Sequence, residues 1–286
     1  MFTKIHLKIL YIFLLLIAYS IRANAHEFWI EPTQYQINDD LINAHLRVGQ
    51  EFQGMVLMYN PQDFKTFKIL SGSKNKKEKI KGILGDVPAI NITTNLDNLL
   101  IIYHETKDKY VDYKKFQKFE DFVNEKGYQQ LINTHFEKGF PESNFIESYR
   151  RYAKSLITLN GSEGKDKKTG LLFEFVLDQN PYKELNSKQM SGTLYYKKKP
   201  LKKNLVTIFS KYKNTKLSIV NTITDDKGKF TFDIEPGREY LLDSVVIYPL
   251  KADPEKNEPI WHSDWASTTF LTVSYTHLRA HETRYD

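Results

Sequence analysis

The residue with the clearest capacity for chemistry in this sequence is His26, which directly follows Ala23, Asn24 and Ala25. Small residues of this kind precede the site that a signal peptidase cuts. Cleavage after Ala25 would make His26 the first residue of the mature chain. Its α-amine and its imidazole could then chelate one metal ion, because neutral nitrogen ligands suit nickel, cobalt and copper. The proton of a free α-amine is lost near neutral pH, so a metal ion can displace it.

A terminal chelate needs further ligands, which other imidazoles of the mature chain could supply. They are His45, His104, His135 and His262. His262 lies between two tryptophans, which could form a dry site, and His45 begins a predicted strand. We therefore predict a metal site made of His26, His262 and His45. The alternative for His26 is that it only starts the first strand, which Phe28 and Trp29 anchor in the core. The alternatives for the other histidines are a structural role for the tryptophan-rich segment, a strand-end position for His104 and a surface position for His135.

Several enzyme classes are excluded by the composition and the motifs. The chain has no cysteine, so it has no thiol catalysis, no thiolate metal site and no disulfide. None of the His-Glu pairs completes the H-E-x-x-H motif, because Ile30, Asp108 and Tyr285 occupy the last position. The sequence also lacks the G-x-S-x-G, P-loop and dinucleotide-binding patterns. We therefore expect a metal-binding protein that is not an enzyme.

Two alternatives to that expectation stay open. A terminal histidine with a second histidine is the ligand set of a copper histidine brace, which would make the protein an oxidative enzyme. The third possibility is a binding module for a carbohydrate or a protein that uses no metal.

Residues 1–25 have the composition of a signal peptide. Lys4 and Lys8 precede an apolar run over residues 9–21, which is short for a membrane span. We therefore expect cleavage, a periplasmic location and no stable insertion in the membrane afterwards. An uncleaved anchor is the alternative. The formal net charge of +6 does not indicate a nucleic-acid partner, because the Lys and Glu residues are interspersed as on a solvated surface.

The elements that must position the histidines are mostly predicted strands. Residues 27–103 contain short apolar runs separated by turn signals, which is typical of a β-sandwich. Residues 161–272 contain a second strand-rich block. We predict a mainly β fold of two β-sandwich domains, Ig-like or transthyretin-like, over residues 26–160 and 161–272.

A helical insertion is predicted over about residues 112–157. Phenylalanines recur at helical spacing between residues 116 and 122, and a second helix is predicted over 129–138. A third helix is predicted over 145–156, because its apolar residues fall on one face of a helical wheel.

Three cationic residues of that third predicted helix, Arg150, Arg151 and Lys154, lie away from its apolar face. Such a group could bind an anion, and the alternative is an ordinary solvated surface.

Residues 273–286 are predicted to be a non-native tail. The string SYTHLRAHET at residues 274–283 resembles a translated sequencing adaptor, and it follows a predicted strand without a turn signal. His277 and His281 are four residues apart and would otherwise suggest a helical metal pair. We exclude both from the predicted site.

Five stretches in the same order resemble a family of bacterial periplasmic proteins that is catalogued as a domain of unknown function. They are HEFW at 26–29, VGQEFQG at 48–54, ESYRRYAKSL at 147–156, FEFVLDQNPY at 173–182 and WHSDWASTTF at 261–270. The resemblance covers nearly the whole mature chain. Some members are associated with nickel and cobalt uptake systems, beside energy-coupling-factor transporters. The resemblance therefore implies nickel or cobalt as the bound ion and a membrane metal transporter as a partner.

The C-terminal block carries a second resemblance. The stretches TDDKGKFTF at 224–232 and PGREY at 236–240 look like parts of a transthyretin-like or carboxypeptidase-regulatory-like β-sandwich. Neither resemblance implies an established activity.

Overall fold

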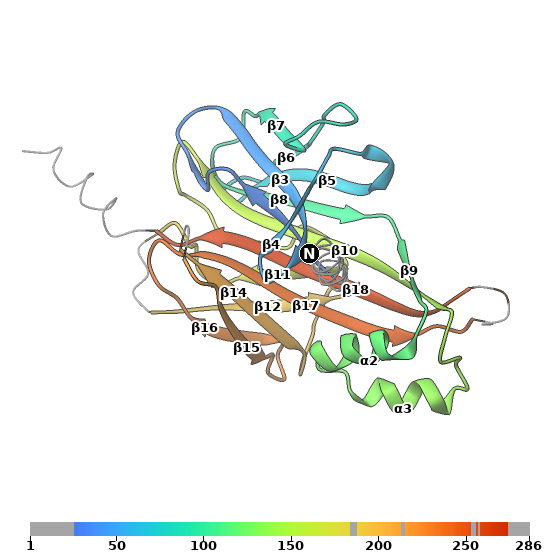
Figure 1. The fold of residues 1–286 in the computed structure, drawn as a ribbon. Coiled ribbons are helices and arrows are strands. Elements are labelled where there is room, and N and C mark those ends of the chain that lie inside the picture. Colours follow the sequence, from blue (N-terminus) through green and yellow to red (C-terminus); the bar gives the residue numbers. More distant parts are fainter. Residues whose placement is uncertain (1–25, 184–187, 213–214, 253–255, 257, 274–286) are drawn as a thin grey trace, which may run out of the picture.

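The computed structural model describes residues 26–183, 188–212, 215–252, 256 and 258–273. Within them the chain is mainly β, with three sheets and two α-helices (Figure 1). This confirms the predicted fold class. The predicted signal peptide and residues 274–286 of the predicted tail lie outside the described residues. No helix among the described residues is long and apolar enough to cross a membrane.

The largest sheet crosses the molecule in the order β15-β14-β17-β18-β10-β8-β5-β6, and β2 and β9 also pair with β10. Its strands are β2 (Gln36–Ile37), β5 (Phe64–Ser71), β6 (Lys77–Lys79), β8 (Asn98–Thr106), β9 (Lys109–Tyr113), β10 (Phe145–Leu159), β14 (Leu205–Lys211), β15 (Ser218–Ile223), β17 (Glu239–Pro249) and β18 (Pro259–Leu271). The central strands β10 and β18 run parallel to each other, although residues 160–258 separate them in sequence.

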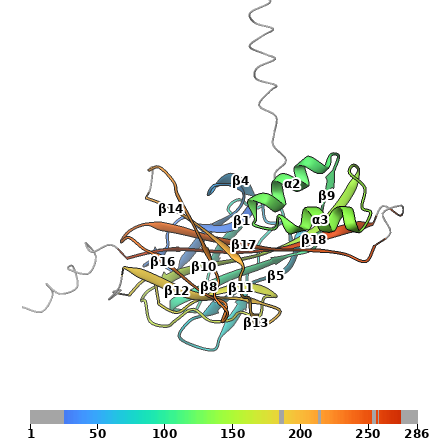
Figure 2. The ribbon, with the colours of Figure 1, turned by 90° about the horizontal axis from the view of Figure 1, so that it is seen from below.

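Two smaller sheets lie on opposite faces of the large one (Figure 2). One contains β1 (Glu27–Pro32), β3 (Leu41–Gln50), β4 (Gln53–Leu57) and β7 (Ile90–Thr93), and the other contains β11 (Phe173–Leu177), β12 (Gln189–Tyr196), β13 (Lys199–Pro200) and β16 (Lys229–Asp233). Successive residues of a strand point to opposite faces. On β18, Ser267 accordingly donates a hydrogen bond to the Phe28 carbonyl of β1, whereas the ring of Phe270 packs near Phe232 of β16.

The two helices cover one end of β18. They are α2 (Phe116–Glu125) and α3 (Gln130–Glu137), and a short 3-10 helix, η1 (Pro61–Asp63), precedes β5. The Phe122 ring of α2 stacks on Trp265, and the Phe119 ring lies 4.8 Å from Trp261. The helical spacing of the phenylalanines therefore predicted α2 correctly, and α3 confirms the second helix of the insertion.

The predicted third helix over 145–156 is wrong, because this segment is the strand β10. β10 lies in the middle of the large sheet and is buried on both faces along most of its length. Such a strand loses the alternation of apolar and polar residues that identifies a half-buried strand. The remaining apolar positions, including Tyr152 and Leu156, matched helical spacing by coincidence.

The large sheet also contains strands from both sides of the predicted domain boundary at residue 160. β10 belongs to the first predicted domain, and its parallel neighbour β18 belongs to the second. The division into residues 26–160 and 161–272 stays a prediction about folding units.

Candidate metal site around His26

His26 stands directly before β1, and contacts from two other elements fix its backbone. Arg151 of β10 donates a hydrogen bond of 3.1 Å from Nη2 to the His26 carbonyl. Glu27 is 1% exposed and pairs with the Lys126 ammonium at 3.0 Å. The same ammonium lies 3.3 Å from the Asp243 carboxylate of β17. The beginning of β1 is therefore held by the large sheet and by the end of α2.

A cavity of about 440 Å³ opens beside His26. Its apolar wall includes Phe28, Leu46, Val48, Leu57, Met58 and Phe64, and its polar groups include His26, Asn60, Asp63, His104, Lys109 and Arg151. A largely apolar cavity with a few converging polar groups is typical of a small-molecule or ion site.

His104 of β8 is the most deeply buried of these polar groups. It is 1% exposed and lies among the rings of Phe28, Phe64 and Phe67 at 4.6 to 5.3 Å. Neither of its ring nitrogens has a hydrogen-bond partner among the described residues. Burial lowers the pKa of His104 to about 3, so the imidazole is neutral at physiological pH. It therefore offers an unused lone pair at the cavity wall.

His26 presents a similar group. Its Nδ1 atom is buried and has no hydrogen-bond partner in the described part of the chain. Burial, and after it the charge of Arg151, lowers the pKa of His26. A six-membered chelate with the α-amine would use this same Nδ1 atom. Buried polar atoms are rarely left unpaired, so two such imidazoles at one cavity require an explanation.

The nitrogen donors that line this cavity are of the kind that transition-metal ions prefer. Within the described ranges, no group of three or more His, Asp or Glu side chains is placed to hold a metal. The side chains of His26 and His104 place two imidazoles at the wall of this cavity. Cleavage before His26 would add the α-amine as a third neutral nitrogen, and such nitrogen donors suit nickel, cobalt and copper.

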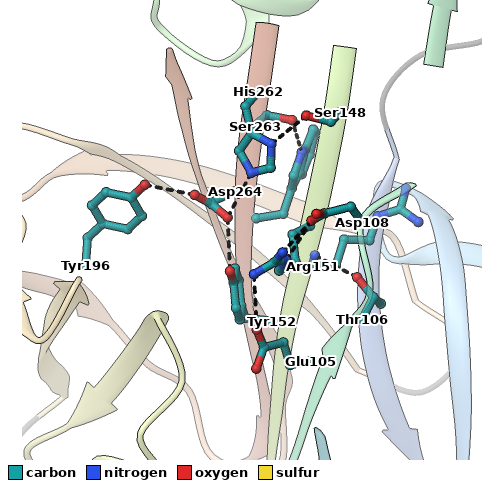
Figure 3. A network of polar contacts seen from close by, with 12 residues as sticks. Glu105, Thr106, Asp108, Ser148, Arg151, Tyr152, Tyr196, His262, Ser263 and Asp264 are labelled. Carbon is teal, nitrogen blue, oxygen red and sulfur yellow. Dashed lines mark hydrogen bonds and ion pairs between the residues drawn. The ribbon is translucent and has the colours of Figure 1, made fainter. Parts of the chain in front are cut away.

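The structure places His262 and His26 on opposite sides of the large sheet. The neighbours of His262 in β18 show this, because Ser263 and Trp265 face α2 while Asp264 faces the sheet of β12. His262 Nδ1 lies 2.7 Å from Ser148 Oγ, and Nε2 lies 3.3 Å from Asp264 Oδ1 (Figure 3). Both ring nitrogens are therefore already used within the protein.

His45 is also separated from His26. It pairs in register with Glu31, at the far end of β1 from His26. Its neighbour Leu46 lines the cavity, so the alternation of β3 points His45 to the opposite face. The structure thus brings neither His45 nor His262 together with His26.

The sequence predicts that His104 lies at the end of a strand. The strand runs on to Thr106, and every residue from Leu99 to Thr106 is buried. A histidine inside a run of eight buried residues is the signal that could have identified it. The predicted surface position of His135 is wrong, since it is fully buried and accepts a hydrogen bond of 3.1 Å from the Trp261 indole.

The charged residues around the cavity differ in how they are paired. Lys109 pairs with Asp63, which also accepts a hydrogen bond of 2.9 Å from the Asn60 amide. Among the three cations of the predicted third helix, Arg150 pairs with Asp108 at 2.7 Å, away from the cavity.

The other two cations of that group differ in exposure, because Lys154 is fully buried and Arg151 is half-buried. Lys154 is fully buried and pairs with Asp166 at 2.8 Å. Arg151 alone among the three lines the cavity. Arg151 and Lys154 therefore do not lie on an ordinary solvated surface, which was the alternative to an anion site.

The chain is thus a mainly β protein that has a histidine-lined cavity at the start of its first strand. The sequence model of a family described as a domain of unknown function (DUF4198) matches residues 23–247, and this chain belongs to that family. A comparison with curated protein sequences finds no match. The crystal structure of a tetra-tandem repeat in the extending region of a large adhesion protein is 10% identical, with a TM-score of 0.23. The match covers 86% of this chain and 49% of that one, so this chain spans about half of that structure's length.

Proposed function

We propose that this protein is a periplasmic accessory protein that binds nickel or cobalt for a membrane uptake system. One observation carries the proposal. His26 Nδ1 and both ring nitrogens of His104 are buried at one cavity without hydrogen-bond partners in the part of the chain that the structure describes. A polar atom buried without a partner costs free energy, and a bound metal ion would remove that cost.

The surroundings of the two imidazoles support ion binding. Both histidines have lowered pKa values because of burial, so protons compete weakly with a metal ion for their nitrogens. The cavity wall is mostly apolar, which lowers the local dielectric constant and strengthens the interaction between ion and ligand. The ion is cargo in this proposal, and His26 and His104 hold it without changing it chemically.

The location and the partner are also part of the proposal. The predicted signal peptide supports a periplasmic location, and the resemblance to proteins found beside nickel and cobalt transporters supports a membrane transporter as the partner. Membership of the DUF4198 family assigns no activity.

A copper histidine-brace enzyme is the second candidate, because the same observation favours it. A terminal amine and two imidazoles are the ligands of such a site, and copper binds nitrogen ligands more tightly than nickel or cobalt. The third candidate, a metal-free module for a carbohydrate or a protein, would use the cavity itself.

Metal titration of the mature protein separates these candidates. Mass spectrometry first establishes whether the exported chain begins at His26. Nickel, cobalt and copper are then titrated by calorimetry into the wild type, His26→Ala and His104→Ala, with His45→Ala as the matched control. We expect both cavity variants to lose at least about tenfold in nickel affinity, and the control to match the wild type.

The outcomes are distinct. Equal nickel affinity in all four proteins contradicts the proposal and favours the metal-free module. Binding that is selective for copper, with peroxide-driven turnover, favours the enzyme. A mature chain that begins at any other residue removes the α-amine from the site and contradicts both metal candidates.

A further inference from the structure

The cavity is larger than a bare metal ion requires. Its volume of about 440 Å³ falls within the range of about 300–1,000 Å³ that is usual for small-molecule sites. The His26 and His104 donors occupy only part of its wall. The rest of the volume can hold a ligand that arrives with the ion.

The charge at the cavity indicates what kind of ligand this is. Arg151 lines it, and no carboxylate of the described residues forms an ion pair with Arg151 at 4.0 Å or less. Its Nε atom is buried and has no hydrogen-bond partner there either. Lys109, the other cation at the wall, is already paired with Asp63. The carboxylates of Glu27, Asp243 and Glu147 stabilise its charge only from beyond ion-pair distance. An anionic ligand in the cavity would give the guanidinium a direct partner.

The guanidinium is also held in a fixed orientation. Its Nη2 donates to the His26 carbonyl at 3.1 Å, and its Cζ atom lies 4.7 Å from the centroid of the Tyr149 ring and 6.0 Å from that of the Phe28 ring. Arginine binds carboxylates through its planar fork, and a fixed fork loses less entropy on binding. Arg151 therefore lies beside the proposed ion with unused donor capacity.

We propose that the cavity accepts the metal ion together with a small carboxylate chelator, and that Arg151 binds the carboxylate. This inference rests on the proposed function. The protein supplies three nitrogen donors from His26 and His104, which leaves coordination positions on the ion for ligands that the cargo brings. The cargo is thus a metal–carboxylate complex and not the hydrated ion.

A comparison of two nickel complexes tests this inference in the mature protein. Nickel iminodiacetate carries two carboxylates around an amine, and nickel diethylenetriamine carries amines at the corresponding positions. Calorimetric titration of both complexes, and of hydrated nickel, is carried out on the wild type, Arg151→Gln and Arg151→Lys. Arg150→Gln is the matched control, because Arg150 is the neighbouring residue and pairs with Asp108 outside the cavity.

We expect Arg151→Gln to weaken the iminodiacetate complex by at least about tenfold and to change the other two titrations by less than about threefold. Arg151→Lys restores part of the lost affinity, because it keeps the charge without the fork. Arg150→Gln behaves as the wild type. Circular dichroism and thermal unfolding verify that each variant is folded. If Arg151→Gln does not fold, the comparison of the three titrations is made with Arg151→Lys.

Three results would overturn the inference. An equal loss for all three forms of nickel in Arg151→Gln means that Arg151 only supports the position of His26. Removal of nickel by iminodiacetate without a ternary complex, while hydrated nickel still binds, leaves the proposed function intact and overturns the carboxylate inference alone. Absence of nickel binding in every form by the wild type contradicts the proposed function itself.

Discussion

At the scale of single residues, His104 is notable because both of its ring nitrogens are buried without a hydrogen-bond partner among the described residues. An imidazole among three phenylalanine rings gains little from its polarity, because its nitrogens have no partner in the described residues. A phenylalanine would fill the same position with no unpaired polar atom. The histidine therefore costs stability, and the proposed ligand role would explain this cost.

Replacement of His104 by phenylalanine is expected to stabilise the metal-free protein. Leaving a buried polar group unpaired costs about 1–3 kcal/mol, and His104→Phe removes that cost at a small change in volume. We expect a gain of about 1 kcal/mol in the free energy of unfolding, measured by urea denaturation in the presence of a chelating agent, together with loss of nickel binding. A destabilised variant would show that the imidazole has a structural role.

Glu147 gives a prediction about pH. Burial raises its pKa to about 7 from the usual 4.5. The folded state therefore binds the Glu147 proton more tightly than the unfolded state. The stability that this proton provides is fully present below about pH 4.5 and is lost as the pH rises through 7. The effect by pH 8 is on the order of 3 kcal/mol.

Glu147→Gln should remove this dependence, because an amide stays neutral. Tyr113 and Ser263, which donate hydrogen bonds to Glu147, can still pair with the amide. We expect the midpoint of thermal unfolding to fall less between pH 5 and pH 8 than in the wild type. Glu137→Gln, on the exposed face of α3, is the control. The expectation fails if the midpoint of thermal unfolding changes equally with pH in Glu147→Gln and in Glu137→Gln.

At the scale of elements, the sequence was informative where one face of an element is buried. The phenylalanine spacing of α2 and the position of His26 before the first strand could both be read from it. β10 could not be predicted from the sequence, because a strand that is buried on both faces does not alternate between apolar and polar residues. Its burial depends on β18, which lies far along the chain. The position of His104 inside β8 could not be predicted from the sequence for the same reason, because β8 is also buried along nearly its whole length.

The helical insertion has an identifiable role in positioning His26. Lys126 follows α2 directly, and its ammonium neutralises Glu27 beside His26 and Asp243 of β17. All three residues are at most 5% exposed. The end of α2 thus connects the first strand of one small sheet to the large sheet.

Lys126→Met should destabilise the protein strongly, because it leaves two carboxylates buried without a cation. We expect a loss of about 3–5 kcal/mol in the free energy of unfolding, measured by urea denaturation at pH 7.5. Lys118→Met, at an exposed position of the same helix, is the control and should change stability by less than about 0.5 kcal/mol. A similar small effect of both variants would mean that the cluster contributes little.

At the scale of the whole molecule, β10 and β18 join the two halves of the chain. Their ten paired positions, and the pairing of β18 with β17, place strands from both predicted domains in one sheet. Residues 26–160 alone would leave the inner edge of β10 and its apolar faces exposed.

We therefore expect residues 26–160 and 161–273 to be unfolded or aggregated when each is produced alone. Circular dichroism and proton NMR would show poor dispersion for each half, with folded structure only when both are present. A well-dispersed spectrum for either half would support two independent domains, as the sequence predicted.

The central claim is that His26 and His104 hold the same metal ion. X-ray absorption spectroscopy of the nickel-loaded mature protein tests this directly, because scattering from imidazole rings reports how many of them bind the ion. We predict ligation by nitrogen and oxygen with two imidazoles in the wild type and in His262→Ala, and with one imidazole in His104→Phe. An unchanged spectrum for His104→Phe, with an imidazole lost in His262→Ala, would contradict the account.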